Sequence, residues 1–161
     1  GPLWVEDPLQ VWHSDGYKRL RDAAPVRICT GEKIEGFREF FPFIVQGGID
    51  VLHPDLCWCG GLSGGRKIAA LAEHYGLPVA LHNCGTLVHN MANIHFGACV
   101  RNFNMTESRL YARDYIAEMG GLDSYDFEDG KIAVPTGPGL GIELVEDVLR
   151  RELKEGEPFW D

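Results

Sequence analysis

Short apolar runs that each end in an ionisable side chain recur along this chain at nearly constant spacing. The runs cover residues 3–6, 26–32, 49–55, 78–82 and 103–107, and their last residues are Glu6, Glu32, Asp55, His82 and Glu107. Successive ends are therefore 26, 23, 27 and 25 residues apart. Such a unit holds one short strand, one helix of about 12 residues and two loops. The repeat predicts alternating strands and helices, and hence a parallel sheet with right-handed crossovers.

Helical periodicity fills the intervals between these runs. We expect helices over residues 14–24, 35–45, 64–75 and 90–100. Ser63 is a candidate N-cap for the third helix, and Gly76 is a candidate stop for it. Pro42 lies inside the second pattern, where a proline removes a helical hydrogen bond.

Two architectures fit this alternation: an open doubly wound sheet and part of a (β/α) barrel. A doubly wound nucleotide-binding fold needs a glycine-rich turn after its first strand, and Glu6-Asp7-Pro8 is not one. In a barrel, functional side chains lie at the carboxyl ends of several strands. A complete barrel has eight strands, so we predict an α/β chain that forms a partial (β/α) barrel of about five parallel strands with intervening helices.

After Glu107 the pattern changes. We expect a helix over residues 108–119, a turn at Asp129-Gly130 between two short extended segments, an irregular loop at 135–141 and a short helix within 142–153. Nothing resembling a linker separates the tail at 120–161 from the rest of the chain. We therefore expect residues 1–161 to be one unit with an irregular and helical C-terminal tail.

Composition excludes several classes of protein. The formal net charge is −9, which disfavours binding to nucleic acid or to an anionic membrane surface. No apolar run approaches the roughly 20 residues of a membrane span. The five cysteines are odd in number and are not spaced as a disulfide framework, so we expect a cytoplasmic protein.

The ionisable strand ends suggest a chemistry. Glu6 and Glu32 would lie at the ends of adjacent strands, where two carboxylates can share a Mg²⁺ ion. Asp55 and His82 follow on the next two strands, and an Asp that accepts the N–H of a His prepares the imidazole for proton transfer. Glu107 could hold a substrate oxygen, or it could form a salt bridge with Arg109 or Arg113.

Other histidines and the cysteines offer weaker alternatives. His53, His74, His89 and His95 are better explained as packed or surface histidines, and we assign them no role. Cys57-Trp58-Cys59 with His82 and Cys84 could bind zinc, but paired zinc cysteines are usually separated by two residues and here by one.

The ordered set of motifs resembles the C-terminal half of the enolase superfamily, in its mandelate racemase/muconate lactonizing enzyme branch. The motifs are Trp4-Val5-Glu6-Asp7-Pro8, Thr30-Gly31-Glu32, Pro54-Asp55 with Gly60-Gly61-Leu62, Leu81-His82, Glu107 and Pro138-Gly139-Leu140-Gly141. The resemblance implies that Glu6 and Glu32 are metal ligands, that Asp55 and His82 form a catalytic dyad, and that Glu107 helps to hold the substrate. It also implies that residues 1–161 are the C-terminal part of a barrel domain, whose first strands and N-terminal capping domain are absent from this chain.

The function implied by the resemblance is a Mg²⁺-dependent dehydratase of acid sugars (aldonates), a hydro-lyase that removes the proton next to a carboxylate. The alternatives are a racemase or epimerase on the same scaffold, or a non-catalytic half-barrel fragment. The implied partner is a small acid-sugar substrate, and the full-length protein is expected to be a homo-oligomer.

Overall fold

A single parallel sheet organises the first two thirds of the chain. The computed structural model describes residues 1–108, 113–122, 125 and 127–160. The strands are β1 (Val5–Glu6), β2 (Ile28–Thr30), β3 (Val51–Leu52), β4 (Val79–Leu81) and β5 (Phe103–Thr106). They pair in the order β1-β2-β3-β4-β5, and every pair is parallel. Because the order never reverses, the winding is that of a partial barrel, and the predicted fold class is confirmed.

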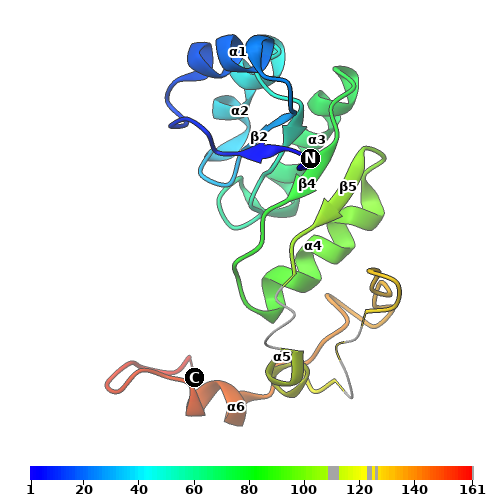
Figure 1. The fold of residues 1–161 in the computed structure, drawn as a ribbon. Coiled ribbons are helices and arrows are strands. Elements are labelled where there is room, and N and C mark those ends of the chain that lie inside the picture. The colour runs from blue at the N-terminus through cyan, green and yellow to red at the C-terminus, as the bar shows by residue number, and fades with distance from the viewer. Residues whose placement is uncertain (109–112, 123–124, 126, 161) are drawn as a thin grey trace.

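One helix connects each strand to the next. The helices are α1 (Ser14–Ala23), α2 (Gly36–Val45), α3 (Gly61–His74) and α4 (Leu87–Cys99), and Figure 1 shows them following the strands in turn. All four were predicted, and α2 continues through Pro42. The expected N-cap at Ser63 is wrong, because α3 already begins at Gly61. Gly60 and Gly61 have φ values of 99° and 66°, so two left-handed glycines make the turn that starts this helix earlier.

The central strands are buried on both faces. Ile28, Leu52 and Leu81 belong to the main core, which the strands form together with the apolar faces of the helices. Cys29, Val51 and Ala80 form a smaller buried layer on the opposite face, with Trp4 packed against it. Continuous burial explains why these strands are apolar runs without polar alternation.

The tail forms a second core against α4. Its helices are α5 (Arg113–Met119) and α6 (Glu146–Arg151), and Figure 1 shows them beyond the α4 side of the sheet. Leu87 and Met91 of α4 pack in one cluster with Met119 and Val148. Of the helix expected over residues 108–119, the structure describes Arg113–Met119 as helical and Ser108 as not helical, and residues 109–112 lie outside the described residues.

The structure also bears on the turn expected at Asp129-Gly130 and on the question of a membrane span. Asp129 and Gly130 have φ values of 50° and 71° and join an antiparallel bridge between Glu128 and Lys131, which confirms the two-residue turn. Among the described residues, the longest helices fall short of the length and apolarity that crossing a bilayer demands.

Candidate active site at the carboxyl ends of the strands

All five candidate residues lie at one edge of the sheet. Glu6 ends β1, His82 and Glu107 directly follow β4 and β5, and Glu32 and Asp55 come shortly after β2 and β3. Since the strands are parallel, these positions share the carboxyl-end edge, which we call the rim. A chain of short distances, given below, joins all five side chains. The structure therefore brings together every residue that the strand-end pattern selected.

Asp55 and His82 form a direct pair. His82 Nδ1 lies 2.7 Å from Asp55 Oδ2, and Asp55 is only 2% exposed. The Cys57 backbone N–H donates to Asp55 Oδ1 at 2.6 Å, which fixes the orientation of the carboxylate. With Nδ1 engaged, the Nε2 atom of His82 is the one free to exchange a proton.

The free nitrogen of His82 faces two further carboxylates. His82 Nε2 lies 3.3 Å from Glu32 Oε2 and 3.8 Å from Glu107 Oε2. Glu107 is itself positioned by the loop after β4, because the Asn83 backbone N–H donates to its Oε2 at 2.8 Å. The site thus combines a proton-transfer group with acidic oxygens at hydrogen-bonding to ion-pairing distance.

A lysine links the loops after β1 and β2. Lys33 Nζ lies 2.9 Å from Asp7 Oδ2 and 3.0 Å from Glu32 Oε1. The hydrogen bonds that Lys33 donates to Asp7 and to Glu32, the former having the larger effect, raise the pKa of Lys33 above its ordinary value. Asp7 also accepts the Thr30 hydroxyl at 2.7 Å. One oxygen of Glu32 is therefore held by Lys33 while the other faces His82.

His53, to which sequence reasoning assigned no role, is central to the rim. It is 1% exposed, and its Nδ1 lies 3.0 Å from the carbonyl oxygen of Ala80. Its Nε2 lies 3.6 Å from Glu6 Oε2 and 3.7 Å from Glu107 Oε2, and this buried atom has no hydrogen-bond partner among the described residues. The available signal was its position two residues before Asp55 in the run 49–55, where alternate residues of a strand would share a face, although β3 itself ends at Leu52.

His89 was also missed. It is the third residue of α4, and its Nε2 lies 3.5 Å from Asp55 Oδ1. Within the part of the chain that the structure describes, this Nε2 is a second buried nitrogen without a hydrogen-bond partner. Burial lowers the pKa of His89 below its ordinary value, which favours the neutral imidazole. Helical periodicity did not predict that His89 would face the rim. It does so only because α4 packs beside β4 and β5.

The donor set can be tested against a divalent cation. Glu6 and Glu32 offer carboxylate oxygens, the donor type that Mg²⁺ prefers. Among the described residues, Glu6 groups with Cys29 and His53, with ligand atoms within 4.8 Å of one another, whereas no such group of three joins Glu6 to Glu32. The chemistry of the carboxylates fits a hard cation, but these residues would supply only part of its shell.

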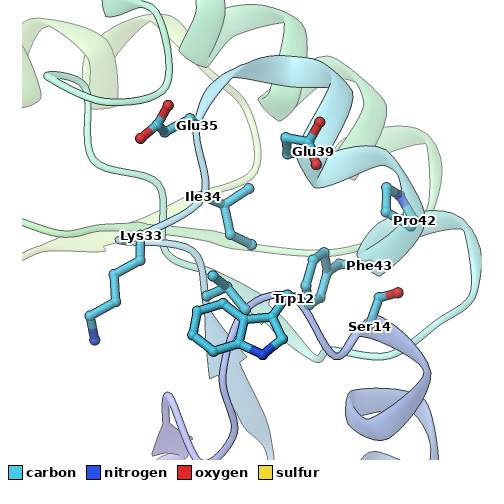
Figure 2. Close-up of a pocket in the computed structure, with 9 residues that line it drawn as sticks. Trp12, Ser14, Lys33, Ile34, Glu35, Glu39, Pro42 and Phe43 are labelled. Carbon is cyan, nitrogen blue, oxygen red and sulfur yellow. The ribbon is translucent and has the colours of Figure 1, made fainter.

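The pocket drawn in Figure 2 lies beside the rim and does not contain the dyad. It has a volume of about 400 Å³ and lies between the start of α1, the loop after β2 and α2. Trp12, Ile34 and Phe43 form its apolar wall in Figure 2, where Lys33 extends away from them. Its lining contains none of the five strand-end residues, so we do not place the chemistry there.

Comparison with known sequences identifies the family of this chain. The family model for enolase C-terminal domain-like proteins matches residues 1–148. A D-gluconate dehydratase from Thermoproteus tenax is 31% identical over 99% of this chain and 33% of its own length. A D-xylonate dehydratase from Haloferax volcanii is 30% identical over 98% of this chain and 38% of its own length. The chain thus spans between a third and two fifths of these two relatives.

Solved structures share the fold. The crystal structure of a mandelate racemase/muconate lactonizing enzyme-like protein from Rubrobacter xylanophilus superposes with a TM-score of 0.91. It is 30% identical, and the match covers 100% of this chain and 41% of that one. The arrangement of strands, helices and tail is therefore that of a segment within a larger, known architecture.

Proposed function

This chain belongs to the enolase C-terminal domain-like family, and from that premise we propose that it is the dyad-bearing part of a Mg²⁺-dependent acid-sugar dehydratase. In this proposal residues 1–161 form the C-terminal part of an enolase-type barrel domain. The substrate is an aldonate, and the reaction is a hydro-lyase reaction. The two dehydratases at 30% and 31% identity support this choice of reaction.

The observation that carries the proposal is the Asp55–His82 pair facing carboxylates on the rim. A proton next to a carboxylate is very weakly acidic, so a histidine can remove it only where the resulting charge is stabilised. A divalent cation held by Glu6 and Glu32 would act as a Lewis acid on the substrate carboxylate. The chain's own residues then have to move the proton.

In the proposed reaction, His82 Nε2 takes up or delivers a proton while Nδ1 stays bonded to Asp55. Loss of the proton next to the carboxylate leaves an enolate, and the hydroxyl on the neighbouring carbon departs with a proton as water. Asp55 holds the imidazole in the tautomer with Nδ1–H and stabilises the protonated ring. In this proposal Glu107 binds a substrate oxygen, which is supported by the hydrogen bond that it accepts from the Asn83 backbone N–H and by its 3.8 Å distance from His82 Nε2.

The second candidate is a racemase or epimerase, which the structural match to a mandelate racemase/muconate lactonizing enzyme-like protein favours. In that reaction the proton returns to the opposite face of the enolate and no water is lost. A panel of aldonates in deuterated water separates the two, because dehydration gives a new keto acid whereas racemisation gives the inverted stereoisomer with deuterium at the carbon next to the carboxylate. We also propose a cytoplasmic homo-oligomer, and the five free cysteines suit a reducing compartment.

The test of the dyad uses two substitutions in the protein at its full natural length. We expect His82→Asn to lower kcat for aldonate dehydration by about 10²–10⁴-fold, because asparagine cannot exchange a proton near neutral pH. Asp55→Asn should do less damage, since it keeps an oxygen acceptor but loses the charge. Turnover is measured with Mg²⁺, after chelation and after Mg²⁺ is restored.

His74→Asn is the matched control, because His74 is exposed near the end of α3, away from the rim. Thermal midpoints and Mg²⁺ affinity are measured on the same samples. Near wild-type turnover in His82→Asn, or a loss that only follows unfolding, would remove His82 from the mechanism. Full activity after chelation would contradict the proposed metal dependence.

A further inference from the structure

Asp55, Cys57 and His89 place three different ligand types together at the rim. Their carboxylate oxygen, sulfur and imidazole nitrogen all lie within 4.8 Å of one another. The three residues come from the turn after β3 and from the first part of α4. The hydrogen bond from the Cys57 backbone to Asp55 Oδ1 already fixes two of them relative to each other.

The third ligand is an unpartnered buried nitrogen. His89 has a side chain that is 4% exposed, and no described residue forms a hydrogen bond with its Nε2, although this atom lies 3.5 Å from Asp55 Oδ1. A buried polar atom without a partner is costly and requires an explanation. A cation between the nitrogen, the carboxylate oxygen and the sulfur would satisfy all three at once.

The donor set selects the kind of cation. Mg²⁺ and Ca²⁺ prefer oxygen ligands, whereas a thiolate with an imidazole suits Zn²⁺ and related ions. Zinc bonds are about 2.0 Å to nitrogen and about 2.3 Å to sulfur. The 3.5 Å between His89 Nε2 and Asp55 Oδ1 already suits two ligands of one such ion, and the Cys57 sulfur, within 4.8 Å of both, has to approach more closely. Cys57 is exposed, which gives the ion a path to the buried His89.

We propose that Asp55, Cys57 and His89 form a second cation site, for a thiophilic divalent metal such as Zn²⁺, next to the Asp55–His82 pair. It is distinct from the carboxylates Glu6 and Glu32, and its binding does not depend on the proposed dehydratase activity. Three protein ligands leave one tetrahedral position for water. This set differs from the Cys57 and Cys59 pair that the sequence suggested. Cys59 is only 1% exposed, and His89 takes its place as a ligand.

A consequence for activity follows, and it rests on the proposed function. Asp55 would bind the cation through Oδ1 while its Oδ2 holds His82. A cation there withdraws negative charge from the carboxylate that supports the imidazole, so Zn²⁺ should inhibit proton transfer.

Binding is tested on metal-free protein in an excess of Mg²⁺, which occupies the carboxylates. Zn²⁺ is titrated by calorimetry, and Co²⁺ is used as a spectroscopic probe whose thiolate charge-transfer band reports a bound sulfur. We expect one Zn²⁺ per chain. Cys57→Ser should weaken binding by roughly 100-fold or more and abolish the Co²⁺ band, since loss of even an outer-shell partner costs 10–100-fold.

Three further variants make the result decisive. Cys99→Ser is the matched control, because Cys99 is an exposed cysteine at the last residue of α4, and it should bind Zn²⁺ as wild type does. Glu32→Gln should also keep Zn²⁺ binding, even if it loses the proposed Mg²⁺ site. His89→Gln should lose Zn²⁺ binding. If His89→Gln does not fold because His89 is buried, Cys57→Ser still tests the Zn²⁺ site, since Cys57 lies in an exposed turn.

Several outcomes overturn the proposal. Equal Zn²⁺ affinity in Cys57→Ser and wild type removes the site. Loss in Cys84→Ser but not in Cys57→Ser would move the ion to the neighbouring group of Asp55, His82 and Cys84. Zn²⁺ binding through Cys57 without inhibition of turnover would leave the site in place and overturn its coupling to the dyad.

Discussion

At the scale of single residues, the rim is governed by histidines in three different surroundings. His82 has Nδ1 bonded to Asp55 and its Nε2 directed at other carboxylates. His53 is bonded to a strand carbonyl and keeps a buried Nε2 between Glu6 and Glu107. Burial lowers the pKa of His89 below its ordinary value. The three rings share a residue type and differ in their partners, and on those partners rest our proposals of proton transfer for His82 and metal binding for His89.

A substitution at His53 tests whether its hydrogen bond to the Ala80 carbonyl oxygen matters. We expect His53→Leu to lower the free energy of unfolding by about 1–3 kcal/mol, because it leaves a buried acceptor of β4 unpaired. His53→Gln keeps an N–H donor and should lose less. Urea denaturation of the two variants measures this difference. Equal stability of His53→Leu and wild type would show that the hydrogen bond contributes nothing.

At the scale of elements, the rim depends on how closely neighbouring strand ends approach. Gly31 follows β2 with a φ of 149°, and a Cβ there would lie 2.8 Å from the carbonyl carbon of His53. The backbone after β2 therefore passes directly against the backbone after β3. Glu32 follows β2, and Asp55, which pairs with His82, follows β3, so this close approach helps to bring Glu32 within reach of His82.

Gly31→Ala should therefore be strongly destabilising. We expect a loss of about 3 kcal/mol in the free energy of unfolding, from the disallowed φ together with the clash against fixed backbone. Gly36→Ala is the matched control, because Gly36 has a φ of 68° but open space around its Cα. It should cost only about 1 kcal/mol. Similar losses in the two variants, measured by chemical denaturation, would mean that the contact with His53 is not restrictive.

At the scale of the whole molecule, two cores and two open sheet edges define the chain. The main core joins the strands to their helices, and the second core fastens the tail to α4. Within the described sheet, β1 and β5 each have a partner on one side only. Next to the β1 edge, Leu3 is 69% exposed and Val5 is 38% exposed. An unpaired apolar strand edge is a template for association.

The 161-residue chain by itself should therefore self-associate as its concentration rises. Val5→Lys should shift this equilibrium toward monomer, because a charged residue on an edge strand opposes pairing. Val134→Lys is the control, since Val134 is exposed to a similar extent, 43%, in the tail. Sedimentation velocity over a concentration series measures the association. A monomer at every concentration, or equal effects of both variants, would contradict pairing through β1.

The sequence by itself determined the order of strands and helices and the common edge of the five ionisable strand ends. Both follow from local information: apolar runs of strand length at a fixed spacing, and the rule that parallel strands end on the same side. Asp55 and His82 were therefore recognisable as neighbours although 27 residues separate them.

Only the tertiary structure decided which other side chains enter the rim. His53 and His89 looked ordinary along the chain, because nothing local shows which face of a strand end or of a helix will meet a neighbouring loop. The position of His89 depends on the packing of α4 beside β5, and that of His53 on its hydrogen bond to the carbonyl oxygen of Ala80 in β4. The starting point of α3 was likewise set by two left-handed glycines, and no N-cap side chain marks it. Contacts between residues far apart in sequence added His53 and His89 to the site, and such contacts leave no periodic signal.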